Sequence, residues 1–309
     1  MNDIIASRRL IPTPGPAPED IIAGPDGMLY CGLQDGRILQ LDPDTEAVKT
    51  VATVPGRPLG LEPLPDGRLL VCNSPNGLMR VDPATGRVES LLTGIGGKRL
   101  IFASNVVAAR DGTVWFTASS MRYTQPQWRR DLIEAIPTGH LIRLDPDGRA
   151  TVLADDLHFA NGLVLAADES HLIYAETAAR RLSRWWLTGP KAGQRELMCE
   201  LPGYPDNLGR GADGMVWAAM PTRFNPLLEK MRGWPWVLRW MGARLPHFMQ
   251  PKPEPIAWIL CISPDGRILH DLMWTDGGYG FVTGVCVHRD RLWCGSLSEP
   301  AILSCKLPQ

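Results

Sequence analysis

Two phrases of similar design carry polar side chains, Phe159-Ala-Asn161-Gly-Leu and Gly203-Tyr-Pro-Asp206-Asn-Leu. In each phrase the polar residue lies seven positions ahead of a turn centred on an aspartate, Asp168 or Asp213. The residues at the same offset from the other turns of this kind complete a set: Glu19, Leu59, Ser104, Asn161, Asp206 and Thr283. If these side chains converge, the five polar ones (two carboxylates, one amide and two hydroxyls) form a cluster with oxygen ligands only, which suits Ca²⁺ better than Zn²⁺.

The chemistry of such a cluster follows from its two carboxylates. Crowded carboxylates need a counter-charge, and no equivalent position holds Lys or Arg, so we expect a hard cation there. Ca²⁺ is favoured, and Mg²⁺ fits a mixed amide cage less well. The competing interpretation is that these polar side chains only cap strand starts and bind channel water.

A cation with open coordination positions can polarise a lactone, ester or phosphoester oxygen and stabilise the charge that develops there. Asp206 is then the candidate base or nucleophile, because it would lie beside both the cation and the substrate. His158 is a candidate second base, although a single His is more often structural.

The elements that must position these residues come from a repeat. A turn followed by a β-rich phrase occurs six times, at Asp26, Asp66, Asp111, Asp168, Asp213 and Asp290. A second strand follows each turn, at 36–43, 77–83, 139–146, 180–187, 257–264 and 301–307. Four-stranded units about 40 residues apart are typical of propeller blades. We therefore predict an all-β, six-bladed β-propeller that occupies residues 1–309 as a single domain, with the six equivalent positions at one mouth of its channel.

Three segments lie outside the repeat. Residues 8–13 should supply the outer strand of the last blade and so close the ring. Blades 3 and 5 carry helical insertions at about 119–138 and 221–255, where Pro126 can start one helix and Pro235 separates two more. The second insertion has three interpretations: helices packed on the propeller, a lid that selects an apolar substrate, or membrane-surface contact through Trp234, Trp236 and Trp240.

The amino-acid composition restricts the kinds of partner that the protein can bind. The chain has 309 residues, 44% of them hydrophobic, and a formal net charge of -1, which argues against a nucleic-acid partner. Its seven cysteines include no CxxC pair and are expected to be reduced thiols. No charged-then-apolar leader opens the sequence, and no run of about 18 apolar residues exists. We expect a soluble, cytoplasmic protein that binds a small molecule and does not contact a membrane.

Several phrases together identify a resemblance: Thr117–Ser120, Pro137–Asp145, Phe159–Leu163, Ala175–Thr177, Gly189–Gly193 and Leu201–Asn207. From about Pro18 to Leu307 the chain resembles the strictosidine synthase-like branch of the calcium-dependent propeller hydrolases. That superfamily includes gluconolactonases, paraoxonases and the adipocyte plasma membrane-associated protein.

The resemblance implies a six-bladed propeller with Ca²⁺ in its channel. It also implies a metal shell formed by Glu19, Asn105, Asn161 and Asp206. In many relatives the blade-3 asparagine stands at the register of Ser104, whereas here Asn occupies position 105, and we predict Asn105 as the ligand. Relatives that hydrolyse lactones or organophosphates use the aspartate equivalent to Asp206.

The function that we predict is Ca²⁺-dependent hydrolysis of lactones or esters, with side activity on phosphotriesters. Tyr123, Trp128, His158 and Phe159 are the predicted substrate pocket, and its aromatic side chains favour an apolar substrate. Strictosidine synthase depends on a glutamate near its last blade, and residues 276–283 contain none, so no condensing activity is expected. The alternative is a strictosidine synthase-like propeller that binds a ligand or partner without catalysis.

Overall fold

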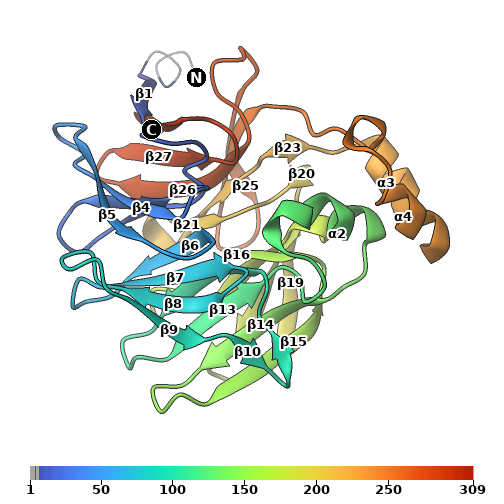
Figure 1. The fold of residues 1–309 in the computed structure, drawn as a ribbon, viewed down its shortest axis with the longest axis horizontal. Helices are drawn as coiled ribbons and strands as arrows, with labels where there is room; N and C mark the ends of the chain where they lie inside the picture. Colours follow the sequence, from blue (N-terminus) through green and yellow to red (C-terminus); the bar gives the residue numbers. More distant parts are fainter. Residues whose placement is uncertain (1–3, 5–6, 309) are drawn as a thin grey trace.

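The computed structural model describes residue 4 and residues 7–308, and it contains six four-stranded antiparallel sheets around a central axis (Figure 1). Blade 1 consists of β2 (Ile21–Ala23), β3 (Leu29–Gly32), β4 (Arg37–Leu41) and β5 (Val48–Thr53). Blade 2 consists of β6 (Arg57–Pro63), β7 (Leu69–Ser74), β8 (Gly77–Val81) and β9 (Val88–Leu92). Blade 3 consists of β12 (Ala103–Ala108), β13 (Val114–Ala118), β14 (Gly139–Leu144) and β15 (Ala150–Leu157).

The second half of the ring repeats this order. Blade 4 consists of β16 (Ala160–Leu165), β17 (His171–Glu176), β18 (Arg181–Trp186) and β19 (Arg195–Glu200). Blade 5 consists of β21 (Leu208–Arg210), β22 (Val216–Ala219), β24 (Ala257–Ile262) and β25 (Ile268–Trp274). Blade 6 consists of β26 (Val282–His288), β27 (Arg291–Ser296), β28 (Ala301–Lys306) and, as its outer strand, β1 (Arg9–Pro12). The predicted six-bladed propeller and its closure by the N-terminal strand are both confirmed.

Bulges in the innermost strands turn side chains toward the axis. The strand pairing slips between Pro58 and Leu61, between Ala103 and Val106, between Ala160 and Leu163, and between Val282 and Val285. These four bulges enclose the predicted positions in blades 2, 3, 4 and 6. In blades 1 and 5 the equivalent residues, Glu19 and Asp206, lie just before β2 and β21. A bulge adds an unpaired residue and changes the direction of its side chain. The bulged residues therefore do not follow the regular hydrogen-bond pattern between the strands.

The residue that follows each of these six positions alternates between glycine and a polar residue: Asp20, Gly60, Asn105, Gly162, Asn207 and Gly284. The glycines are where neighbouring strands approach most closely. A Cβ atom on Gly60 would lie 2.5 Å from the Cα atom of Asn105, and one on Gly284 would lie 2.8 Å from the Cα atom of Asp20. Glycine in every second blade therefore makes room for the polar residue of the next.

The two insertions are helical, as predicted. The first holds η1 (Gln125–Gln127), which contains Pro126, and α2 (Trp128–Glu134). The second holds α3 (Pro226–Arg232), α4 (Trp236–Gly242) and η4 (His247–Met249). The Asn225 side chain caps α3 by accepting a hydrogen bond from the Leu228 amide at 3.0 Å. The remaining short elements are β10 (Gly94–Ile95), β11 (Lys98–Arg99), β20 (Gly203–Tyr204), β23 (Thr222–Arg223), η2 (Thr177–Ala179) and η3 (Ala212–Gly214).

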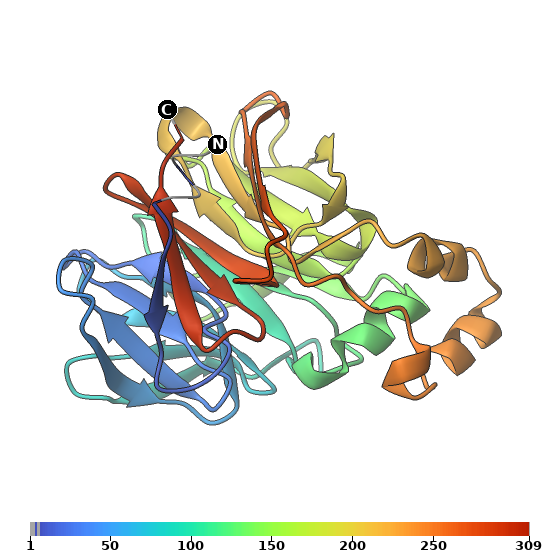
Figure 2. The ribbon, with the colours of Figure 1, turned by 90° about the horizontal axis from the view of Figure 1, so that it is seen from above.

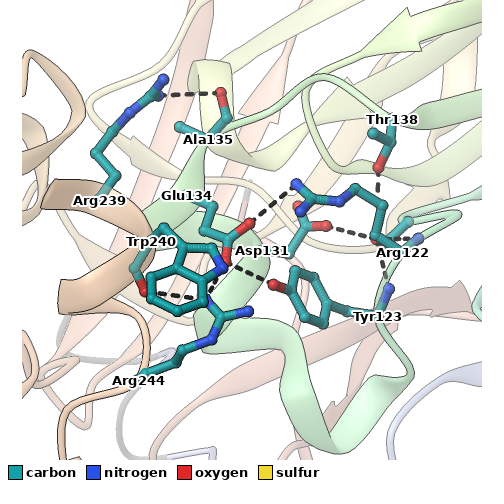
Figure 3. Close-up of polar contacts among 10 residues, drawn as sticks. Arg122, Tyr123, Asp131, Glu134, Ala135, Thr138, Arg239, Trp240 and Arg244 are labelled. Atoms are coloured by element: carbon teal, nitrogen blue, oxygen red, sulfur yellow. Dashed lines mark hydrogen bonds and ion pairs between the residues drawn. The ribbon is translucent and has the colours of Figure 1, made fainter. Parts of the chain in front are cut away.

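A polar cluster ties the two insertions together (Figure 3). The buried Glu134 carboxylate accepts hydrogen bonds from the Tyr123 hydroxyl at 2.6 Å and from Arg244 at 2.8 Å. Arg122 forms an ion pair with it at 2.9 Å. Burial alone would raise the pKa of Glu134, but these donors outweigh burial and lower it. Glu134 is thus a charged anchor between α2 and the chain after α4.

Apolar packing adds to this anchor, since Ile133, Tyr204, Leu228, Met231 and Ala243 form one buried cluster. Figure 2 shows α2, α3 and α4 together on one side of the propeller, with α3 and α4 extending beyond it. Within the described part of the chain, no helix has the length and apolar character needed to cross a membrane. All seven cysteines are free thiols, as expected.

Candidate functional site

One cavity opens at the predicted mouth of the channel. It encloses about 940 Å³ of space that protein atoms do not fill, part of it open to solvent. Its polar lining comes from the propeller, at Glu19, Ser104, Asn161, Thr177 and Asp206, and from the two insertions, at Gln125, Arg129, Thr222 and Asn225. Its apolar lining comes from the propeller and from both insertions, and includes Leu59, Phe102, Phe159, Phe281, Trp128, Leu132 and Leu228. The topology therefore brings five polar side chains from four blades to the floor of an apolar cavity.

Asn161 is the centre of the hydrogen-bond network. Its side-chain N–H group donates to Asp206 Oδ1 at 2.5 Å and to Thr177 Oγ1 at 3.1 Å. Its Oδ1 atom accepts a hydrogen bond from Ser104 Oγ at 2.9 Å, which leaves one lone pair of that oxygen for another partner. These contacts fix the amide in one orientation and hold one oxygen of Asp206 beside it.

Asn207 links a residue of blade 3 to Glu19 of blade 1, and the sequence analysis did not select it. Its Oδ1 atom accepts from Asn105 Nδ2 at 3.0 Å, and its own Nδ2 donates to Glu19 Oε1 at 3.3 Å. The predicted ligand Asn105 thus reaches Glu19 through Asn207, while Ser104 lines the cavity directly. The alternation of glycine with Asp or Asn was the signal that could have revealed Asn207.

The two carboxylates lack sufficient counter-charge. Burial raises the pKa of Glu19 to about 7, against smaller opposing effects of Arg57 and the Asn207 hydrogen bond. Burial, followed by the charge of Glu19, raises the pKa of Asp206 well above its ordinary value. The Oε2 atom of Glu19 is buried without a hydrogen-bond partner. An unpartnered carboxylate oxygen beside a second carboxylate is the electrostatic condition that a bound cation relieves.

Arg57 is a basic residue near the two carboxylates that the comparison of equivalent positions did not include. It lies two positions before Leu59, outside the set of residues compared in the sequence. The side chain is buried, and its Nε and Nη2 atoms have no hydrogen-bond partner. Burial lowers the pKa of Arg57, while Glu19 and Asp206 act to raise it. Part of the negative charge at the axis is therefore balanced by the protein itself.

The donor set nevertheless fits a hard divalent cation. Two carboxylates and the neighbouring amide oxygens are ligands of the Ca²⁺ type, and Glu19 Oε2 has an unused acceptor. Among residues 4 and 7–308, no three His, Cys, Asp or Glu side chains gather in an arrangement that could hold a metal. Ligands beyond Glu19 and Asp206 would therefore have to come from amides, such as Asn161, or from water.

The predicted substrate-pocket residues fall into two groups. Trp128 and Phe159 line the cavity, and Phe159 makes an edge-to-face contact with Phe102 at 5.5 Å between ring centroids. Tyr123 and His158 are not among the lining residues. Tyr123 binds Glu134 instead, and His158 donates its backbone N–H to Glu176 at 3.1 Å. Burial lowers the pKa of the His158 ring, which favours its neutral form.

Three further aromatic residues line the cavity and were missed, Phe102, Tyr204 and Phe281. Each stands two positions before an equivalent residue of the ring, as Phe159 does, and Arg57 holds the corresponding position in blade 2. That recurring offset was readable in the sequence. It places an aromatic layer next to the polar one.

The sequence of this chain is similar to a known family and to several named proteins. The model of the SMP-30/Gluconolactonase/LRE-like region matches residues 21–226. The chain is 31% identical over 294 residues to Protein STRICTOSIDINE SYNTHASE-LIKE 6 of Arabidopsis thaliana, covering 93% of this chain and 78% of that protein. It is 30% identical over 321 residues to the Adipocyte plasma membrane-associated protein of Salmo salar, covering 94% and 76% respectively.

Solved structures share the fold. A gluconolactonase from Xanthomonas campestris superimposes with a TM-score of 0.70 at 19% identity, over 97% of this chain and 89% of that one. Regucalcin from Agrobacterium tumefaciens, described as a calcium-binding protein, superimposes with a TM-score of 0.64 at 16% identity, over 95% and 90%. At these identities the likeness establishes the propeller fold alone.

Proposed function

This chain belongs to the SMP-30/gluconolactonase/LRE-like family, and we propose that it is a Ca²⁺-dependent hydrolase of lactones or esters. The observation that carries the proposal is the pair Glu19 and Asp206, a buried and a half-buried carboxylate that line the same largely apolar cavity. Regucalcin, a propeller of the same fold, is described as calcium-binding, and this supports the choice of ion.

Glu19, Asn105, Asn161 and Asp206 are the residues that we propose to hold the ion. Bound there, Ca²⁺ would polarise the substrate carbonyl and stabilise the negative charge of the transition state. Asp206 would take the proton of the attacking water or attack the carbonyl itself, and the Asn161 amide holds its Oδ1 atom in place. Phe102, Phe159 and Leu228 would exclude bulk water and bind an apolar acyl or alkyl group.

Removal of the metal tests the proposal. We expect the Ca²⁺-loaded protein to hydrolyse members of a panel of lactones and aryl esters, with paraoxon included to detect phosphotriesterase side activity. Chelation should lower turnover by about 10²-fold or more, because the charge of the transition state loses its main stabilisation. Added Ca²⁺ should restore the rate. A folded protein with bound Ca²⁺, shown by calorimetry, that turns over no panel member would contradict the assignment and favour a binding propeller.

A non-catalytic, ligand-binding propeller is the second candidate, and Arg57 is the observation that favours it. A buried guanidinium near Glu19 and Asp206 offsets part of their charge without any metal. A protein of that kind would bind its ligand in the same cavity and would not require the ion. The two candidates therefore differ in the positive charge that neutralises Glu19 and Asp206. In the hydrolase it is a bound cation, and in the binding propeller it is Arg57.

Replacing Arg57 with Met measures the competition between Arg57 and a cation for the two carboxylates. We expect Ca²⁺ to bind about tenfold more tightly or better, because a positive charge near the site is removed and charges several ångströms apart interact by a few kcal/mol at an effective dielectric constant of about 20. Isothermal titration calorimetry at mildly alkaline pH gives the affinity. The matched control is Arg80→Met, which removes an arginine that pairs with Glu89 on outer strands of the same blade. Equal affinities in the wild type and both variants would refute a cation site beside Arg57.

A further inference from the structure

The blade-5 insertion exposes large apolar side chains instead of burying them. Leu227, Trp236, Val237, Met241, Phe248 and Met249 are all exposed, with 64% exposure at Trp236 and 74% at Phe248. We call the exposed apolar side chains of residues 221–255 the insertion face. Soluble proteins rarely gather so many large apolar side chains on one projecting segment without a partner.

The exposure of these side chains follows from the orientation of α4 in the fold. An amphipathic helix normally directs its large apolar residues to the core and its polar ones to solvent. In and just after α4 the buried positions are the small residues Gly242 and Ala243, while Trp236, Val237 and Met241 face outward. The helix is also held in place, because Arg244 binds Glu134 and Arg239 donates to the Ala135 carbonyl (Figure 3).

The charge of the insertion is opposite to that of the rest of the chain. Residues 221–255 contain six Lys or Arg residues and two acidic residues, in a chain whose formal net charge is -1. Both acidic residues have cationic neighbours, since Glu229 binds Arg232 at 3.1 Å and Glu254 lies 3.6 Å from Arg223. Lys230 and Lys252 are exposed and form no ion pair with another described residue. The segment thus presents apolar, aromatic and cationic groups together.

We propose that the insertion face docks on the surface of an anionic lipid bilayer. Tryptophan, phenylalanine and methionine would enter the interfacial region, while the lysines would stay at the level of the headgroups. A second copy of this chain is a poorer partner, because a two-fold contact would bring two cationic segments face to face. This inference departs from the sequence-based expectation of no membrane contact, since it depends on which side chains point outward. It does not depend on the hydrolase activity.

Vesicle co-sedimentation tests the proposal with the full chain. We expect the protein to bind vesicles of phosphatidylcholine with about 30% phosphatidylglycerol, and to bind more weakly to phosphatidylcholine alone or in high salt. The double variant Trp236→Ser, Phe248→Ser should lower the partition coefficient by about tenfold or more. Lys230→Glu combined with Lys252→Glu should remove the preference for anionic vesicles while leaving the weak binding to neutral ones.

The matched control replaces two exposed leucines elsewhere, Leu10→Ser and Leu197→Ser, which are 49% and 53% exposed on β1 and β19. It should bind vesicles like the wild type, and thermal unfolding should show that all variants fold. Absence of wild-type binding, or an equal loss in the control, would overturn the proposal. So would a dimer, seen by analytical ultracentrifugation, that Trp236→Ser, Phe248→Ser dissolves while no chain binds vesicles.

Discussion

Replacing Asp206 with Asn should lower the turnover of a lactone or ester by about 10³-fold while the propeller stays folded. The variant keeps the size of the side chain but removes a negative charge that we assign both to the cation and to the reaction. The Asn161 contact at 2.5 Å holds this side chain in the cavity, so a change of charge, and not of packing, is what the experiment measures. Steady-state kinetics with saturating Ca²⁺ gives the effect on kcat.

The same variant has a predicted signature in stability. In chelator, the pKa values of Glu19 and Asp206 are raised in the folded state, so folding favours their protonated forms. The unfolding free energy should therefore fall as pH rises from the ordinary carboxyl range through about 7, the pKa of Glu19. Asp206→Asn removes one of the two groups, and it should unfold at a higher temperature than the wild type at neutral pH in chelator. It should gain little from added Ca²⁺.

The control is Asp213→Asn, in the exposed turn of the same blade, where the residue has a φ of 52° that asparagine also tolerates. Its kinetics and its response to Ca²⁺ should match the wild type. If Asp206→Asn kept wild-type turnover and the wild-type increase of Tm with Ca²⁺, the role that we assign to Asp206 would have to be abandoned.

Replacing Gly162 with Ala should destabilise the propeller by roughly 3 kcal/mol. The new Cβ atom would lie 2.5 Å from the Asp206 carbonyl oxygen, which is backbone and cannot move aside like a flexible side chain. Because the clash lies between the innermost segments of blades 4 and 5, it should also displace Asp206 from Asn161. Urea unfolding measures the loss of stability, and calorimetry measures the expected loss of Ca²⁺ affinity.

Gly278→Ala is the corresponding control, since the nearest atom to its Cβ would be a side-chain oxygen of Asp276 at 3.5 Å, an ordinary contact. This variant should be within about 0.5 kcal/mol of the wild type. Equal stability of Gly162→Ala and Gly278→Ala would mean that the inner strands can separate freely, contrary to the close approach described above.

Local patterns in the sequence determined most of the fold. Each hairpin turn is a short-range signal, because glycine or a polar residue tolerates the backbone dihedral angles that the turn needs. These turns lie at Asp26, Asp66, Asp111, Asp168, Asp213 and Asp290. Their repetition predicted six blades, and the residues left over predicted the closing strand β1 and the helical insertions. The residues seven positions ahead of the turns reached the cavity in five blades, as Glu19, Leu59, Ser104, Asn161 and Asp206 line it, whereas Thr283 donates to the Glu19 carbonyl instead.

The tertiary structure decided what depends on distance and direction. Arg57 stands two positions before a predicted residue and Asn207 one position after another, and only the packing of the blades brings them to Glu19 and Asp206. Tyr123 and Trp128 are both aromatic and close in sequence, yet the α2 insertion turns one toward Glu134 and the other into the cavity. Likewise, the apolar residues of α4 predict a helix but not the side that it buries. A periodic sequence specifies local backbone geometry, while burial and pairing depend on contacts between residues far apart in the chain.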